Sequence, residues 1–439
     1  MKATRIITTV FIALASLAAN AQEGAWNGEL NVMGTKLPLV FNFSNEDCTM
    51  DSPSQGAKGI PAEKTIKDDG TIKVSVAMIG ATFEGKMENG EIKGTYTQNG
   101  FPIPLTLKPG KLVVKRPQTP VAPFPYKEEN ISFTNAGYTF NGTLTLPQNY
   151  SKQTPVVLMV TGSGQQNRDE ELFDHKPFAV IADALARQGI ASLRYDDRGW
   201  NDKNIDFGQF TTADFLQDAA SALPLLRKRF NKVGILGHSE GGTIAMMLAA
   251  EGKADFIVSL AGMAISGKET LVMQNRQAMS AINLPKDMVD SYCATISNIL
   301  NEIANGKKTS EITIDGVPDN LKPILKRSLE QGNSPYIRHF ITIDAGKQLS
   351  KIKCPVLALN GTKDTQVDCA ANTTILETGL SNCKHTIKKI DGVNHLFQHC
   401  STGSIVEYQQ IEETIAPEVL ETITKWINDQ QRTINEAQE

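Results

Sequence analysis

The sequence lacks the short patterns by which several large classes of protein are recognised. It has no Cys-x-x-Cys and no His-Glu-x-x-His, and its six cysteines and six histidines are scattered over 439 residues. A zinc site or a dense disulfide framework is therefore not expected. It also lacks a Gly-x-Gly-x-x-Gly spacing and a glycine-rich loop ending in Gly-Lys-Ser/Thr, which disfavours nucleotide binding through such loops.

A large excess of charge of one sign is also missing. The 44 Lys and Arg residues stand against 48 Asp and Glu residues. Hydrophobic residues make up 40% of the chain and charged residues 21%, as in an ordinary folded protein. The composition therefore argues against disorder and gives no basis for a nucleic-acid partner.

Apolar stretches of membrane-spanning length are absent after the first 21 residues. Lys2 and Arg5 precede a mostly apolar segment, 6–18, and Ala19-Asn20-Ala21 supplies the small residues of a cleavage site. An unbroken apolar run of fewer than about 18 residues favours removal over membrane anchoring. We therefore expect a signal peptide over residues 1–21, an exported protein in the periplasm or outside the cell, and no stable membrane anchor.

Cysteines in an exported chain are able to form disulfides. Cys369 with Cys383 is the pair that we would test first, and isolated buried thiols are the alternative. His395 and His399 stand four residues apart, which is too few ligands for a metal site.

Residues 22–115 lack histidine altogether and read as a separate β domain. Leu39, Phe41 and Phe43 alternate with other residues, and Asn-Gly or Asp-Gly pairs recur as hairpin signals. This predicts a small antiparallel domain without a catalytic constellation, for which a packing or spacer role is favoured over binding of a glycan or a partner. Four prolines between 116 and 125 predict a stiff linker, which we place at 116–130.

From residue 131 to the C-terminus at 439, strand patterns alternate with helix patterns. The apolar run 155–160 is typical of a buried parallel strand, and residues 178–185 have the spacing of an amphipathic helix. Repetition of this alternation predicts an α/β domain with a mostly parallel sheet that is covered on both faces.

One turn in this domain carries the strongest signal. Gly237-His238-Ser239-Glu240-Gly241-Gly242 lies where the apolar run 233–236 gives way to a helix-like stretch, 243–250. Glycines on both sides let strand and helix approach with no Cβ between them, and the serine of such a turn is held clear of the sheet edge. Ser239 is therefore the candidate nucleophile.

A serine hydroxyl needs a base to take its proton, and on this kind of sheet the base is a histidine that follows the acid in the chain. His395 lies just past the last predicted strand, in a loop at the edge where the serine is expected. His339 falls among helix patterns and His385 begins a strand. His395 is therefore the candidate base, with His399 as the second choice.

The base in turn needs an acid that fixes its tautomer. Asp364 follows the predicted strand 354–359 after a short loop, which places its carboxylate at the same edge as Ser239. Asp368 is better placed to begin the next helix, where a carboxylate has a structural role. The order Ser239, Asp364, His395 is thus satisfied.

The transition state of acyl transfer develops an oxyanion, which needs preorganised donors. One is the backbone N–H of Glu240, at the start of the helix after the nucleophile. The other is expected from the loop Thr161-Gly162-Ser163-Gly164, with the N–H of Ser163 preferred and that of Gly162 as the alternative.

About 90 residues after the strand that ends near 261 show helix spacing in place of strands. This predicts a helical insertion at about 266–350. Because it follows the strand next to the nucleophile turn, we expect it to form a lid that shapes the acyl pocket, rather than an appendage packed elsewhere.

Together these residues resemble a known family. The chain from about 131 onward is similar to the α/β-hydrolase fold, and within it to exported carboxylesterases related to the dienelactone hydrolase and prolyl-oligopeptidase branch. The matching stretches are 162–170, 194–199, 237–242, 361–364 and 394–397. The resemblance implies esterase activity on acyl esters without a cofactor, and Ser239, Asp364 and His395 as the triad. It also implies that Arg168-Asp169-Glu170 and Asp196-Asp197-Arg198, which otherwise read as solvated loops, hold the site loops in place.

The sequence therefore predicts an exported serine hydrolase that cleaves small-molecule acyl esters through an acyl-enzyme intermediate. A serine peptidase of the oligopeptidase branch is the first alternative, although the roughly 95 residues before the linker are too short for a gating propeller. The second alternative is a binding protein for a glycan or a partner on a hydrolase fold without activity.

Overall fold

The computed structural model describes residues 23–436 except 33–34, 45–46, 54–56, 113, 201, 203, 282–283, 315 and 320. The expected signal peptide lies outside the described residues. The chain divides into two compact units, one up to residue 115 together with 405–412, and one made of 116–404 and 413–439.

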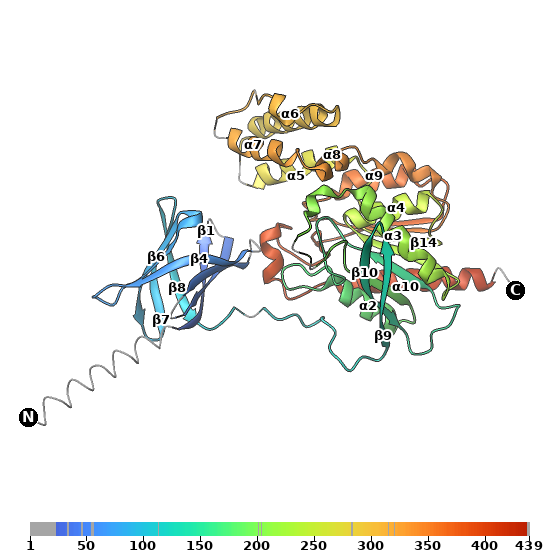
Figure 1. Ribbon diagram of the computed structural model, residues 1–439, viewed down its shortest axis with the longest axis horizontal. Helices are drawn as coiled ribbons and strands as arrows, with labels where there is room; N and C mark the ends of the chain where they lie inside the picture. Colours follow the sequence, from blue (N-terminus) through green and yellow to red (C-terminus); the bar gives the residue numbers. More distant parts are fainter. Residues whose placement is uncertain are drawn as a thin grey trace, which may run out of the picture. The chain divides into compact units, whose positions relative to one another are not determined.

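The first unit is a closed barrel formed by strands β1 to β8, drawn in blue to cyan in Figure 1. Each strand pairs with the next in antiparallel fashion, and β1 pairs with β8 to close the barrel. Its interior is filled by apolar side chains such as Phe41, Val74 and Phe83. The predicted all-β domain is confirmed, and it is a closed barrel rather than an open meander. Its strands are β1 (Gly24–Val32), β2 (Thr35–Phe43), β3 (Cys48–Ser52), β4 (Ala57–Ile66), β5 (Ile72–Val76), β6 (Ala81–Glu88), β7 (Glu91–Gln98) and β8 (Phe101–Pro109).

The proline-rich segment departs from its prediction in two ways. Strand β9 begins at Lys127, so the last four residues assigned to the linker belong to the sheet of the second unit. Arg116 donates from Nη2 to the carbonyl of Phe173 (2.8 Å), and Gln118 donates to the carbonyl of Ile415 (2.7 Å). The segment is therefore bonded to the second unit along part of its length, and it is not a free spacer.

The second unit is built on one mixed sheet with the strand order β16-β15-β14-β13-β11-β12-β10-β9. The pairs β9–β10 and β10–β12 are antiparallel, and the other pairs are parallel. This is the α/β class predicted from the alternating strand and helix patterns. The strands are β9 (Lys127–Asn135), β10 (Tyr138–Leu146), β11 (Val156–Val160), β12 (Ala191–Tyr195), β13 (Val233–His238), β14 (Phe256–Leu260), β15 (Val356–Gly361) and β16 (His385–Ile390).

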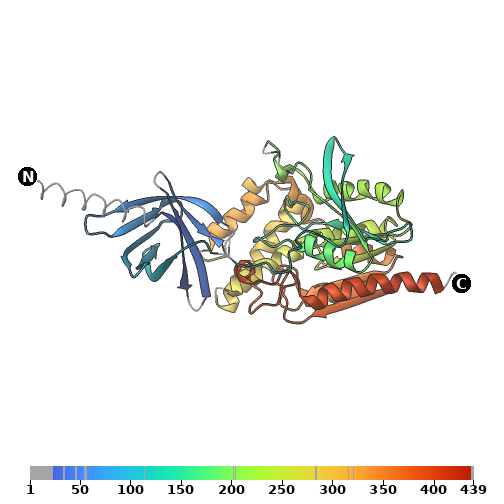
Figure 2. The ribbon, with the colours of Figure 1, turned by 90° about the horizontal axis from the view of Figure 1, so that it is seen from below.

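Helices cover both faces of this sheet. One apolar cluster joins α3 (Thr212–Arg227), α4 (Glu240–Ala250) and α9 (Cys369–Gly379) to one face. Another joins α2 (Pro177–Arg187) and α10 (Pro417–Glu436) to the other face, and Figure 2 shows α10, in red, lying along that side of the unit. Because successive strand residues point to opposite faces, strands buried on both faces read as continuous apolar runs in the sequence.

A helical insertion lies between β14 and β15, as expected for 266–350. It contains α5 (Gly267–Ala281), α6 (Lys286–Ala304), α7 (Lys322–Gln331) and α8 (Pro335–Phe340), and α6 and α7 share an apolar core. In Figure 1, α5 and α8 lie on the side of the insertion nearest the sheet, with α6 and α7 beyond them. Helix α8 contacts α3 and the short η3 (Phe207–Gln209), so the insertion packs on the sheet unit through α8.

The cysteine pair suggested by the sequence is wrong. Within the described residues, which include all six cysteines, no disulfide is formed. Cys369 begins α9 and its thiol contacts the carbonyl of Asn360, at the carboxyl end of β15. Cys383 precedes β16 and lies at the opposite end of the same strand pair, which is too far for a disulfide.

Across the described residues, no helix is both long enough and apolar enough to cross a membrane.

Candidate active site

Ser239 occupies the sharp turn between β13 and α4. Its backbone has a positive φ of 55° with ψ -119°, a conformation that L side chains rarely adopt, and its N–H donates to the carbonyl of Leu260 (2.8 Å). A Cβ on Gly237 would lie 2.0 Å from the carbonyl oxygen of Gly241, and a Cβ on Gly241 would lie 2.0 Å from that of Val160. Only glycine fits at either position, so the glycines of the motif are required by the close approach of strand and helix. The turn leaves Ser239 partly exposed at the sheet edge.

The structure brings Asp364 and His395 together from loops 31 positions apart in the chain, with His395 Nδ1 2.8 Å from Asp364 Oδ2. Asp364 Oδ1 accepts two backbone N–H bonds, from Gln366 and Val367, each 2.8 Å long. Its Oδ2 also accepts from the side chain of Asn360 (3.0 Å). Both partners are buried. The carboxylate is thus fixed by four donors and is aimed at one nitrogen of the imidazole.

Asp368 and His399, the second-choice acid and base, do not contact the Asp364–His395 pair. Asp368 caps α9 by accepting from the N–H of Ala371 (2.8 Å). His399 is half exposed and its two ring nitrogens face Glu413 and Glu418. Neither residue joins the Asp364–His395 pair, which agrees with the preference derived from the sequence.

His238 links the base loop to the nucleophile turn. Its Nε2 lies 2.9 Å from the carbonyl oxygen of His395, and the two imidazole rings are 4.8 Å apart. In the described part of the chain the Ser239 hydroxyl makes no hydrogen bond to His395, and this bond often tightens only when substrate binds. The structure therefore places the candidate base beside the residue that precedes the nucleophile.

The loop after β11 lies directly against the nucleophile. A Cβ on Gly162 would be 3.2 Å from Ser239 Cβ. The Gly162 N–H donates to Glu170 Oε1 (2.7 Å), so the alternative oxyanion donor is already engaged. Within the described residues the N–H groups of Ser163 and Glu240 donate to no acceptor, which leaves both preferred donors available to a substrate oxygen.

Glu170, which the resemblance places among the residues that hold the site loops, forms a buried pair with His238 that the sequence did not predict. Glu170 Oε1 lies 3.0 Å from His238 Nδ1, and Glu170 is 1% exposed. Both ring nitrogens of His238 therefore face acceptors, which requires the doubly protonated imidazolium. Burial alone would lower the pKa of His238, but the Glu170 carboxylate outweighs it, with help from the His395 carbonyl and Asp364, and the pKa is raised above 6.5. The pair ties together the loops of Gly162, Ser239 and His395.

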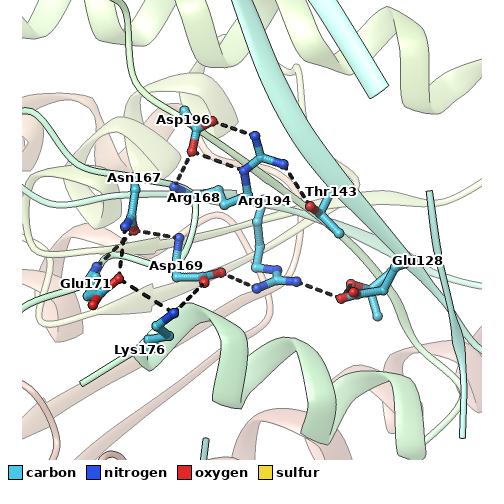
Figure 3. Close-up of polar contacts among 10 residues, drawn as sticks. Glu128, Thr143, Asn167, Arg168, Asp169, Glu171, Lys176, Arg194 and Asp196 are labelled. Atoms are coloured by element: carbon cyan, nitrogen blue, oxygen red, sulfur yellow. Dashed lines mark hydrogen bonds and ion pairs between the residues drawn. The ribbon is translucent and has the colours of Figure 1, made fainter. Parts of the chain in front are cut away.

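The charged stretches flanking the site are bonded to the sheet and are not solvated loops (Figure 3). Arg168 binds Asp196 through Nε and Nη2, at 3.1 and 2.5 Å, and reaches Thr143 on β10. Asp169 pairs with Arg194 of β12, which also binds Glu128 of β9 (2.9 Å). Figure 3 shows these side chains joining the loop to neighbouring strands.

Arg198 bonds the second charged stretch, 196–198, to a neighbouring helix. Its Nε and Nη2 bind both carboxylate oxygens of Asp218 on α3, at 2.9 and 2.8 Å. Its guanidinium also stacks on the rings of Tyr138 and Phe210. This side chain therefore fixes the loop after β12 to α3.

The His238 pair predicts a specific pH dependence of stability. Because its folded-state pKa is raised, the stability contributed by this proton is complete below about pH 6.5 and is lost as the pH rises through the raised pKa. We expect His238→Gln to lower the Tm of the second unit by roughly 6–10 °C at pH 6, and the difference from wild type to shrink as the pH rises. Differential scanning calorimetry from pH 5.5 to 9 measures this.

His385→Gln is the matched control, because His385 is exposed and bonds only the carbonyl of Cys383. Its Tm difference is expected to stay small at every pH. A His238→Gln deficit that is constant across the range would contradict the charge assigned to His238.

Within the described residues, no three His, Cys, Asp or Glu side chains gather in a way that would hold a metal ion.

Comparison with known proteins gives four likenesses. A family model described as serine aminopeptidase, S33 (Hydrolase_4), matches residues 175–296, which include Ser239. Esterase EstD of Thermotoga maritima is 26% identical over 304 residues, which cover 67% of this chain and 68% of EstD. Among solved structures, Est1E of Butyrivibrio proteoclasticus has a TM-score of 0.42 and 17% identity over 69% of this chain and 98% of its own. Dienelactone hydrolase of Anabaena variabilis has a TM-score of 0.40 and 17% identity, over 70% and 98%.

Proposed function

We propose that the chain is a serine esterase of the α/β-hydrolase superfamily that cleaves carboxylic acyl esters, a proposal that the family match and the likeness to EstD support. The observation that carries the proposal is the 2.8 Å contact between Asp364 and His395, beside a glycine-framed turn that presents Ser239. This arrangement supports activation of a hydroxyl for acyl transfer.

In the proposed mechanism, His395 takes the Ser239 proton while Ser239 Oγ attacks the ester carbonyl carbon. The backbone N–H groups of Ser163 and Glu240 stabilise the negative charge that develops on the carbonyl oxygen. The tetrahedral species collapses and the alcohol leaves with the proton from His395. A water molecule activated by His395 then attacks the acyl-enzyme, and the carboxylic acid is released.

The choice of esters over amides rests on the named relative. EstD, which is similar over two-thirds of each chain, is named an esterase. The matching family model is instead described as an aminopeptidase, so amide substrates are the comparison that matters. We also propose that the protein acts after export, on the basis of the signal-like pattern of residues 1–21.

A labelling and substrate experiment tests the proposal. We expect a fluorophosphonate probe to modify Ser239, found by peptide mapping, and a panel of 4-nitrophenyl acyl esters to be hydrolysed. For a matched acyl group, kcat/KM for the ester should exceed that for the 4-nitroanilide by at least about 100-fold, because the amide leaving group must be protonated as it departs.

Faster hydrolysis of an aminoacyl 4-nitroanilide than of the matched ester would favour the peptidase alternative. Failure of the probe to label folded protein, together with no turnover of any ester, would favour a binding protein on a hydrolase fold. Pretreatment with the probe should abolish ester turnover in proportion to the labelled fraction.

A further inference from the structure

One hydroxyl group of the helical insertion contacts the turn that carries Ser239. Tyr336, in the first turn of α8, donates to Glu240 Oε2 (2.6 Å). The other carboxylate oxygen of Glu240, Oε1, accepts from the hydroxyl of Thr212 at the start of α3. Glu240 is 1% exposed. Glu240, which follows the nucleophile, therefore accepts hydrogen bonds from two hydroxyl groups, one from the sheet unit and one from the insertion.

The side chain of Ser163, in the loop on the other side of the nucleophile, lies close enough to the Tyr336 hydroxyl to favour its ionised form slightly. Burial, with the neighbouring Glu240 carboxylate, holds the pKa of Tyr336 well above its ordinary value of 10.0. The phenol therefore keeps its proton over the working pH range and remains a donor to Glu240. The Tyr336 hydroxyl consequently contacts the side chain of Glu240, whose backbone N–H is one of the two expected oxyanion donors.

Aromatic packing fixes the ring that carries this hydroxyl. The Tyr336 ring lies 5.7 Å from that of Phe340 and 6.4 Å from that of Phe215 on α3. Phe215 in turn stacks on Phe207 at 5.0 Å with an interplanar angle of 7°. The hydroxyl is therefore held by a row of rings that continues from the insertion to α3 and η3, and its position follows that of α8.

We propose that Tyr336 is a positioning residue that assembles the oxyanion hole when α8 is seated on the sheet unit. The inference rests on the proposed function and adds the device that couples the insertion to it. With α8 seated, the Tyr336 hydroxyl holds Glu240 in place beside Ser239. With α8 displaced, Glu240 loses one of its two hydroxyl donors, so its N–H group is less well placed.

Removal of the Tyr336 hydroxyl leaves one carboxylate oxygen of Glu240 without its hydrogen-bond donor. A buried carboxylate oxygen without a donor is unfavourable by more than the hydrogen bond is worth, so the side chain will shift toward another donor. Because Glu240 is the first residue of α4, such a shift moves the N–H that points to the substrate oxygen. Loss of one whole oxyanion donor costs about 100- to 1,000-fold in kcat, and misplacement costs less.

Tyr336→Phe tests the inference, since it deletes the hydroxyl and keeps the ring in the aromatic row. We expect kcat for a 4-nitrophenyl ester to fall by about 10- to 30-fold with KM changed by less than about threefold. The rate of fluorophosphonate modification of Ser239 should fall by a similar factor, because that reaction also places negative charge in the oxyanion hole.

Tyr292→Phe is the matched control. Tyr292 is a buried tyrosine of α6 in the same insertion, and its hydroxyl donates to Asn275 on α5 (2.9 Å), not to a residue of the site. Its kcat and labelling rate should stay within about twofold of wild type. The Tm of both variants is measured, so that a general loosening of the insertion is recognised.

Two results would overturn the inference. One is a Tyr336→Phe enzyme whose kcat and labelling rate match those of wild type. The other is an equal loss of kcat in Tyr336→Phe and Tyr292→Phe, which would reflect only the stability of the insertion. Failure of the wild-type protein to hydrolyse esters or to react with the probe would instead count against the proposed function, so the two failures are distinguishable.

Discussion

Ser239→Ala is expected to lower kcat for 4-nitrophenyl acetate by about 10⁵-fold, because no other nucleophile can form the acyl-enzyme. The fold should be unaffected. The Ser239 hydroxyl caps no helix, and a φ of 55° is as unfavourable for alanine as it is for serine. We therefore expect the Tm to stay within about 2 °C of wild type. Turnover is measured with enzyme purified separately from wild type, so that contamination does not set the residual rate.

Ser132→Ala is the control, because Ser132 is exposed on strand β9 and the change is chemically identical. It should retain full activity and full fluorophosphonate labelling. A Ser239→Ala protein that keeps the wild-type rate would remove the nucleophile assignment and the mechanism built on it.

The parts of the site that the sequence predicts are those with a local signature. The turn at Ser239 is defined by glycines within two residues of it, and Asp364 and His395 each follow a strand that the apolar pattern predicts. Since the carboxyl ends of parallel strands share one edge, chain order leads to the expectation that Asp364 lies near His395, and the structure has a 2.8 Å contact between the two side chains. The contact between His395 and Ser239 remains a prediction.

The contacts that sequence reasoning missed join distant segments of the chain. Glu170 and His238 are 68 positions apart, and Glu240 and Tyr336 are 96 apart. A lone tyrosine in a helical insertion has no pattern that sets it apart from a core residue. The sequence did contain one signal for the Glu240 contacts. A glutamate carboxylate directly after the nucleophile cannot face the negatively charged oxyanion, and once buried it needs hydrogen-bond donors from other segments.

Boundaries were less predictable than elements. We place the end of the linker at residue 130 because the apolar strand pattern begins at Ile131, yet β9 already starts at Lys127 in a charged stretch, Lys-Glu-Glu, that reads as loop. Its acidic residues are used in the fold, since Glu128 pairs with Arg194 and Glu129 with Arg229. Charge on an edge strand thus conceals a strand from a hydrophobicity pattern.

Asp364→Asn should lower kcat by about 10⁴-fold while the protein stays folded. The reason lies in the donors around the carboxylate. Two backbone N–H groups hold Oδ1, so the amide oxygen of asparagine will take that position. The amide nitrogen must then face His395 Nδ1. An imidazole whose Nδ1 accepts a hydrogen bond carries its proton on Nε2, which is the wrong tautomer to take a proton from Ser239. KM should change little, because Asp364 is not expected to touch the substrate.

Asp368→Asn is the control that separates the two acids considered from the sequence. Asp368 Oδ1 caps α9 through the N–H of Ala371, and asparagine is an equally good cap, so kcat should stay within about twofold of wild type. The pH profile of kcat for Asp364→Asn gives a further check. Raising the pH toward neutrality should not restore kcat, because the histidine stays in the wrong tautomer. In strong alkali, hydroxide attack on the ester will raise the residual rate. Equal activity in the two variants would mean that Asp364 only supports the loop after β15 and that His395 is oriented by another group.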